Sequence, residues 1–177
     1  MSFLKEFSIQ FASLNPGNYE FKFVADEKFF EKFDESEVRN GHVNIAVDLE
    51  KQARMLILNF VIEGTVKLIC DRCLDEYDQQ IHSEERLIVK LGKEMKEETE
   101  EIIMIPESDH SISLIQFIYE FIHLALPTKR VHPLDNKGKT SCDKDVIKKL
   151  EDYEKTNNNE DEKSDPRWDA LKNIKFN

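Results

Sequence analysis

The chain has 177 residues, a length that suits one domain with at most a small appendage. Its 36 acidic and 25 basic side chains give a formal charge of −11, which excludes a broadly cationic surface that coats nucleic acid or anionic membrane. Hydrophobic residues make up 40% of the chain, so it can form a packed core, and disorder throughout is excluded.

Strand-like alternation dominates residues 1–92, which are predicted to be β-rich. Apolar side chains recur at every second position in the segments 7–11, 19–23, 43–49, 56–68 and 81–91. In the longest of these segments Gly64 marks an expected bulge or tight bend. A helix is predicted within residues 26–35, where Phe29, Phe30 and Phe33 have helical spacing. The one-sided alternation predicts an antiparallel sheet with one wet face, or a small open barrel.

The second part of the chain changes to helical periodicity. Residues 93–109 are predicted to form an acidic connector, in which the apolar island 102–105 adds an edge strand. In residues 111–126 the polar Gln116, Glu120 and His123 lie at i, i+4 and i+7, which leaves a wide apolar face to cover the sheet. A second helix is predicted over residues 143–154. The expected fold class is therefore α+β, with the sheet in the N-terminal two-thirds covered by C-terminal helices.

The predicted domain organisation follows from these patterns. Residues 1–155 are expected to form a single α+β domain, in which 110–155 are helical. The polar and acidic run 156–164 is predicted to be a flexible linker. Residues 165–177 are predicted to form a short helix, because Asp165 is a good N-cap and Pro166 suits the first turn.

Cellular placement is predicted from segments that the sequence lacks. No apolar run reaches the ~18–20 residues that a membrane-spanning helix needs. Residues 1–6 lack the basic start and apolar centre of a secretory signal. We expect a cytoplasmic protein without a membrane partner, so the three cysteines are predicted to be free thiols or metal ligands.

The most specific local motif is Cys70-Asp71-Arg72-Cys73, between two strand-like segments. Two thiolates at this spacing can bind one zinc ion, and Cys142 and His132 are the candidates for the other two ligands. Two other interpretations stay open: free thiols in a turn, and a redox pair. A redox motif usually opens a helix, whereas a strand-like run follows Cys73.

Catalytic motifs are missing from the sequence. It contains no Gly-rich phosphate loop, no nucleophile elbow and no His-Glu-x-x-His pair. Its carboxylates lie in solvated charge runs instead of apolar surroundings that would tune an acid or base. The sequence predicts neither an enzyme nor a small-molecule substrate.

Basic side chains gather between residues 128 and 149, where seven lysines and arginines face three aspartates. A patch of this kind can contact phosphates, although a solvated helix face has the same composition. The candidate contacts to RNA or to a partner, including residues near the CxxC motif and in the terminal helix, are Lys67, Arg72, Lys129, Arg130, Lys137, Lys139, Arg167 and Trp168.

The order of several short elements resembles the YceD family of large ribosomal RNA subunit accumulation proteins. The resemblance is carried by Phe29-Phe30, by residues 69–74, by Leu126-Pro127, by Val131-His132-Pro133 with Cys142, and by residues 165–171. The most specific of these are the CxRCL element and the terminal DPRxxxL element.

This resemblance implies a non-enzymatic bacterial factor needed for accumulation of large-subunit rRNA. The implied partner is that rRNA or a pre-ribosomal particle, and the alternative is an acidic module that binds a basic ribosomal protein. Relatives carry further cysteines near the C-terminus, whereas this chain has only Cys142 there. The resemblance therefore implies ligand positions only at Cys70 and Cys73. Arg167 and Trp168 either anchor the terminal helix to the domain or dock it on a partner.

Overall fold

A computed structural model of the chain describes residues 6–34, 36–93, 96–99, 101–134 and 138–157. The chain divides into two compact units. The first, here called the sheet unit, consists of Met1–Ile69 and Glu76–Arg130, and the second, the cysteine unit, of Cys70–Asp75 and Val131–Asn177. The residues expected to form one domain, 1–155, are thus shared between two units. Most of the expected linker and the whole expected terminal helix, residues 158–177, lie outside the described residues.

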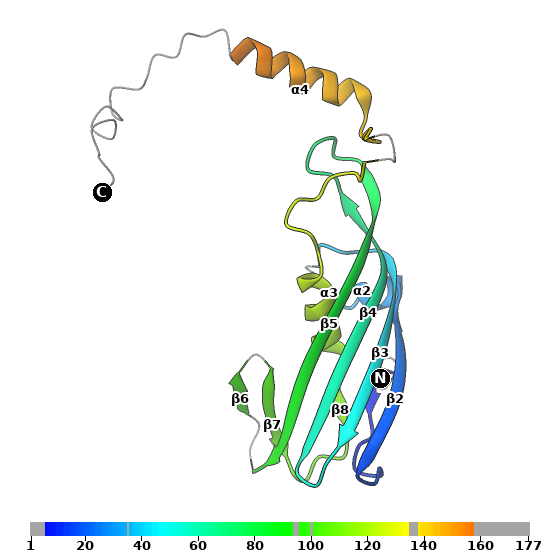
Figure 1. Ribbon diagram of the computed structural model, residues 1–177, viewed down its shortest axis with the longest axis vertical. Coiled ribbons are helices and arrows are strands. Elements are labelled where there is room, and N and C mark those ends of the chain that lie inside the picture. Colours follow the sequence, from blue (N-terminus) through cyan, green and yellow to red (C-terminus); the bar gives the residue numbers. More distant parts are fainter. Residues whose placement is uncertain (1–5, 35, 94–95, 100, 135–137, 158–177) are drawn as a thin grey trace, which may run out of the picture. The chain divides into compact units, whose positions relative to one another are not determined.

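The sheet unit contains a six-stranded, mostly antiparallel sheet in the order β2-β3-β4-β5-β7-β6 (Figure 1). The parallel pair is β5 with β7, and its neighbours pair antiparallel. A separate two-stranded ladder joins β1 (Ser8–Ile9) to β8 (Ile112–Ser113). The sheet strands are β2 (Gly17–Ala25), β3 (Gly41–Lys51), β4 (Met55–Ile69), β5 (Glu76–Gly92), β6 (Lys96–Thr99) and β7 (Ile102–Pro106). The predicted α+β class with an antiparallel sheet is confirmed.

Burial along the strands follows the alternation in the sequence. On β4 the buried side chains share one parity, and the same holds for the apolar positions of β3. Asn59 and Glu63 on β4 are exposed, because successive side chains of a strand point to opposite faces. The sheet therefore has one apolar and one wet face. The buried β4 side chains are Leu56, Leu58, Phe60, Ile62, Val66 and Leu68.

The prediction of a bulge at Gly64 is wrong. Both ladders of β4 keep a continuous register through Gly64, which lies opposite Val43 on β3 and Ile81 on β5. The reason for glycine is a close approach of two backbones. A Cβ atom at this position would lie 2.3 Å from the carbonyl oxygen of His42.

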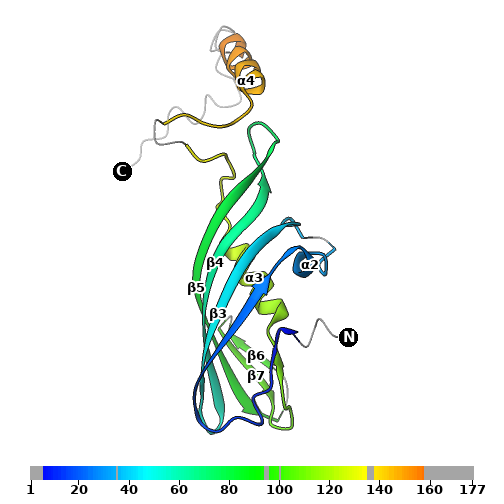
Figure 2. The same ribbon diagram turned by 90° about the vertical axis from the view of Figure 1, so that its right-hand side faces the viewer.

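Helix α3 (Ile115–Leu124) lies across the apolar face of the sheet (Figure 2). The ring centroids of Phe121 on α3 and Phe60 on β4 are 5.1 Å apart. The helix is shorter than the expected span 111–126, because residues 112–113 pair as β8. None of the helices among the described residues is long and apolar enough to span a membrane.

The described residues also form helices α2 (Glu27–Phe30) and α4 (Lys144–Asn157). Helix α2 covers only the start of its expected span, and Asp26 caps it by accepting from the backbone N–H of Phe29 at 3.3 Å. Helix α4 belongs to the cysteine unit and begins one residue after its predicted start. Its cap is Asp143, whose carboxylate accepts from the N–H groups of Asp145 and Val146.

Strands β6 and β7 lie within the segment expected to be a charged connector. The apolar island 102–105 does form a strand, but β7 pairs with β5 on one side and β6 on the other. The edge strand at this end of the sheet is β6, which contains glutamates that the sequence pattern alone would place in a loop.

Candidate metal centre

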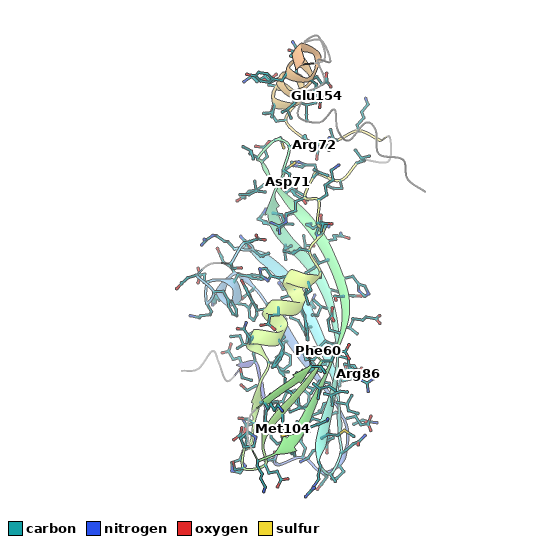
Figure 3. The ribbon with its side chains drawn as sticks, turned by 90° about the vertical axis from the view of Figure 1, so that its left-hand side faces the viewer. Phe60, Asp71, Arg72, Arg86, Met104 and Glu154 are labelled. Atoms are coloured by element: carbon teal, nitrogen blue, oxygen red, sulfur yellow. The ribbon has the colours of Figure 1, made fainter. Side chains whose placement is uncertain are left out.

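A tight turn of six residues, Cys70–Asp75, follows β4 and precedes β5 (Asp71 and Arg72 are labelled in Figure 3). The N–H of Cys70 donates to the carbonyl of Asp75, and the N–H of Leu74 donates to the carbonyl of Cys70, both at 2.9 Å. Leu74 adopts the left-handed conformation at φ 64°, which reverses the chain directly after the second cysteine. This local geometry turns the Cys70 and Cys73 side chains inward, and both are buried.

Four side chains of the cysteine unit converge on one point. The Sγ atoms of Cys70 and Cys142 are 3.7 Å apart, and the Nδ1 atom of His132 lies 3.5 Å from the Sγ atoms of both Cys73 and Cys142. All four ligand atoms lie within 4.8 Å of one another, and all four residues are buried. The pairing of the CxxC motif with Cys142 and His132, expected from the sequence, is therefore present in the fold.

These separations match the edges of a zinc coordination tetrahedron. A zinc ion with Zn–S near 2.3 Å and Zn–N near 2.0 Å separates two sulfurs by about 3.8 Å and a sulfur from a nitrogen by about 3.5 Å. The sulfurs are too far apart for a disulfide, whose bond length is about 2.05 Å. Three thiolates and one imidazole are soft to borderline ligands, a set that favours zinc over magnesium or calcium.

Backbone N–H groups prepare one of the thiols for ionisation. Burial raises the pKa of Cys70, but N–H groups of Cys73, Arg72 and His132 point at its sulfur and lower the pKa to about 6. The Arg72 N–H lies 3.5 Å from that sulfur. For Cys73 burial dominates and raises the pKa of its thiol. A cation in the cluster would stabilise both thiolates, because it supplies the charge that burial makes costly to leave unpaired.

The candidate contacts to RNA or to a partner are spread over both units. Lys67 and Arg130 lie in the sheet unit, where Lys67 pairs with Asp78 and Arg130 with Glu37. Lys129 is exposed in the same unit, whereas Arg72 and Lys139 are exposed in the cysteine unit. Three further candidates, Lys137, Arg167 and Trp168, lie outside the described residues.

Sequence reasoning did not single out Asp143 or Leu74. Asp143 follows the ligand Cys142 directly and caps α4, so the cluster and the start of the helix are adjacent along the chain. An aspartate before an apolar periodic run is a recognisable N-cap signal. Leu74 carried no such signal, because only the fold gives it a left-handed backbone and a side chain that is 76% exposed.

The fold and the cluster define a class: an α+β protein with an open antiparallel sheet and a buried three-cysteine, one-histidine centre. A scan against protein-family models matches residues 58–175 to the family described as Large ribosomal RNA subunit accumulation protein YceD. This match covers more than half of the chain, so the chain belongs to the YceD family, and the resemblance found in the sequence is confirmed. No curated protein and no solved structure matches the chain.

Substitutions at Leu74 test the geometry of the turn. We expect Leu74→Gly to leave zinc affinity unchanged or raised, because glycine adopts the left-handed conformation without steric cost. Leu74→Val is expected to lower the zinc affinity about fivefold, because a β-branched residue in the left-handed conformation is strained by about 1 kcal/mol or more. Chelator titration of both variants measures this. Equal midpoints for the two variants would show that the turn does not require this backbone conformation.

Proposed function

We propose that the chain is a non-enzymatic ribosome biogenesis factor of the bacterial cytoplasm that supports accumulation of 23S rRNA. It would act by binding that rRNA or a pre-ribosomal particle. The observation that carries this proposal is membership of the YceD family, whose description names accumulation of the large ribosomal RNA subunit. The charge distribution is consistent with a small contact, because an overall charge of −11 opposes adhesion to RNA elsewhere on the surface.

The proposal includes a structural zinc ion held by Cys70, Cys73, His132 and Cys142. Four protein ligands complete a tetrahedron and leave no open position for a substrate, which is the arrangement of structural sites. The ion would tie the turn at residues 70–75 to the segment 131–142. Because Asp143 caps α4 directly after the ligand Cys142, the ion would also fix where that helix starts.

The proposed RNA contact lies in the cysteine unit. Lys144 and Lys148 are exposed and one helical turn apart, so they lie on the same face of α4. Arg72 and Lys139 are exposed in the same unit. Lys67 and Arg130 lie in the sheet unit, where they pair with Asp78 and Glu37. Lysines of this kind contact phosphates and release counterions from the RNA.

Depletion in cells tests the proposed function. We expect loss of the protein to lower the ratio of 23S to 16S rRNA, measured on total RNA. The wild-type chain should restore the ratio, and the double variant Lys144→Gln with Lys148→Gln should restore it poorly. The matched control is Lys22→Gln with Lys28→Gln, which removes the same charge from exposed positions of the sheet unit. An unchanged ratio after depletion would eliminate the proposal.

Binding to a 23S rRNA transcript then distinguishes the proposed rRNA contact from the alternative function, an acidic module that binds a basic ribosomal protein. The slope of log K against log salt should be shallower by about 2 for the Lys144 and Lys148 double variant, one unit for each phosphate contact. Retention on a basic ribosomal protein, with no retention on the transcript, would instead favour the acidic interaction module.

A further inference from the structure

Strand β2 lies at one border of the six-stranded sheet, and β6 lies at the other (Figure 1). On its inner side β2 pairs with β3 from Gly17 to Ala25 without a bulge. No backbone hydrogen bond between described residues joins β2 to a segment other than β3. The N–H and C=O groups on the outer side of β2 therefore form a row that another strand can pair with, here called the β2 edge.

The side chains of β2 alternate between two faces of the sheet. Glu20 and Lys22 are exposed on the wet face, where they form an ion pair at 3.0 Å. Tyr19, Phe21 and Phe23 point to the opposite face, and each is only partly buried. Charged side chains on an edge strand often oppose pairing with another chain. On the β2 edge their effect depends on the order of the two signs, because an acid and a base lie on either side of Phe21.

This order of charges is self-complementary when two β2 strands meet antiparallel. A two-fold axis through Phe21, perpendicular to the sheet, would place Glu20 of each copy opposite Lys22 of the other. Residues directly opposite each other point to the same face, so the same register would set Tyr19 opposite Phe23. Moving the axis by one residue in either direction would place Glu20 opposite Glu20 or Lys22 opposite Lys22. Only the register centred on Phe21 pairs unlike charges.

The neighbouring strand β3 favours the same register. Glu20 lies opposite Asp48 of β3, so it faces a like charge on the inner side of β2. Lys22 lies opposite Ala46, which has no carboxylate. In the register centred on Phe21, each Glu20 would lie between two lysines, its own Lys22 and that of the second copy. The additional lysine would offset the repulsion between Glu20 and Asp48.

We propose that two copies of this chain pair antiparallel through their β2 edges, about a two-fold axis at Phe21. The pairing would join the two sheets into one and give hydrogen-bond partners to the outer backbone groups of both strands. It would also cover the partly exposed aromatic face of β2. The β2 edge lies in the sheet unit, whereas the metal ligands and the proposed RNA contacts on α4 lie in the cysteine unit. The pairing is therefore independent of the rRNA contact proposed above.

Analytical ultracentrifugation of the full chain over a range of concentrations tests the pairing. The wild type should change from one chain to two as its concentration rises. Lys22→Glu and Glu20→Lys would each place like charges opposite each other, so each should raise the dissociation constant of the dimer at least about tenfold. These substitutions change the net charge in opposite directions, so a weakening common to both cannot come from overall charge. The double variant, which exchanges the two charges, should pair like the wild type.

Arg86→Glu is the matched control, because Arg86 is exposed on β5 and separated from β2 by β3 and β4. It changes the net charge as Lys22→Glu does and should leave the dissociation constant unchanged. Circular dichroism shows whether each variant is folded. Hydrogen exchange of the wild type needs no variant: amides of β2 should exchange more slowly at concentrations that favour the dimer.

Three results would overturn the proposal. The first is a wild type that stays a single chain at every concentration, or a dimer whose β2 amides exchange as fast as those of the single chain. The second is pairing of the single variants that equals that of the wild type. The third is a folded double variant that pairs no better than the single variants.

Discussion

Replacing Cys142 with serine is expected to abolish stoichiometric zinc binding, although the CxxC motif stays intact. The wild-type chain, purified without chelator, should hold about one zinc ion, because the separations Cys70–Cys142, Cys73–His132 and Cys142–His132 already match the edges of a zinc tetrahedron. The variant loses one of three thiolates, and we expect its zinc affinity to fall by at least about 100-fold. Elemental analysis after gel filtration measures the stoichiometry.

The same substitution should loosen one unit and spare the other. Amides of residues 131–134 and 138–157 are expected to exchange faster with solvent, because the cluster is what joins this segment to the turn at residues 70–75. Amides of β3 and β4 should stay protected. A zinc chelator should reproduce the change in the wild type, and added zinc should reverse it.

Ser141→Ala is the matched control, since Ser141 is exposed and directly precedes the ligand. It should retain both the zinc and the slow exchange of the wild type. One zinc ion per chain in the Cys142→Ser variant, or none in the wild type, would contradict the proposed centre.

Gly64→Ala is expected to destabilise the sheet unit by about 3 kcal/mol or more, a large effect for adding one methyl group. The new Cβ would lie 2.3 Å from the carbonyl oxygen of His42 and 2.6 Å from the Cα of Val43. Both atoms belong to the backbone of β3, so no side chain can rotate away. Strands β3 and β4 would have to separate within a continuous ladder, close to the end at which Gly41 pairs with Val66.

Thermal unfolding measures this effect, which should appear as a melting temperature lower by about 6–12 °C. The control is Asn59→Ala on the same strand, which changes an exposed side chain and should alter stability by less than about 0.5 kcal/mol. The folded Gly64→Ala variant should still bind zinc, because all four ligands lie in the cysteine unit. A melting temperature equal to that of the wild type would show that the two backbones are not in such close contact.

The strand pattern was predictable because successive side chains of a strand point to opposite faces, so a sheet with one buried face has alternating apolar and polar residues. Every apolar position predicted on β4 is buried, from Leu56 to Leu68. The role of Gly64 was not predictable, since a bulge and a close approach of two strands both favour glycine. The acidic strand β6 was missed for a similar reason: its backbone pairs with β7, whatever its side chains suggest about solvent.

For the candidate centre, the sequence indicated which residue types could act as ligands, but only the fold shows that they lie close together. Cys70 and Cys73 are close in the chain, and their spacing alone predicts that both thiols can face one ion. Cys142 is a candidate because it is the only other cysteine of the chain, and His132 because it lies in the loop after the long helix. Their Nδ1 and Sγ atoms lie 3.5 Å apart, and the same nitrogen is 3.5 Å from the sulfur of Cys73.

The sequence by itself determined the fold class, the family and the chemical character of the two ends of the CxxC turn, because these depend on local periodicity and on short motifs. Only the tertiary structure decided which distant residues complete the cluster and which apolar residues remain exposed. Those outcomes depend on contacts between residues far apart in the chain, such as Cys70 with Cys142. They also depend on how much of a helix face a sheet can cover, which leaves Leu124 in water while Ile118 is buried. No pattern along the chain contains that information.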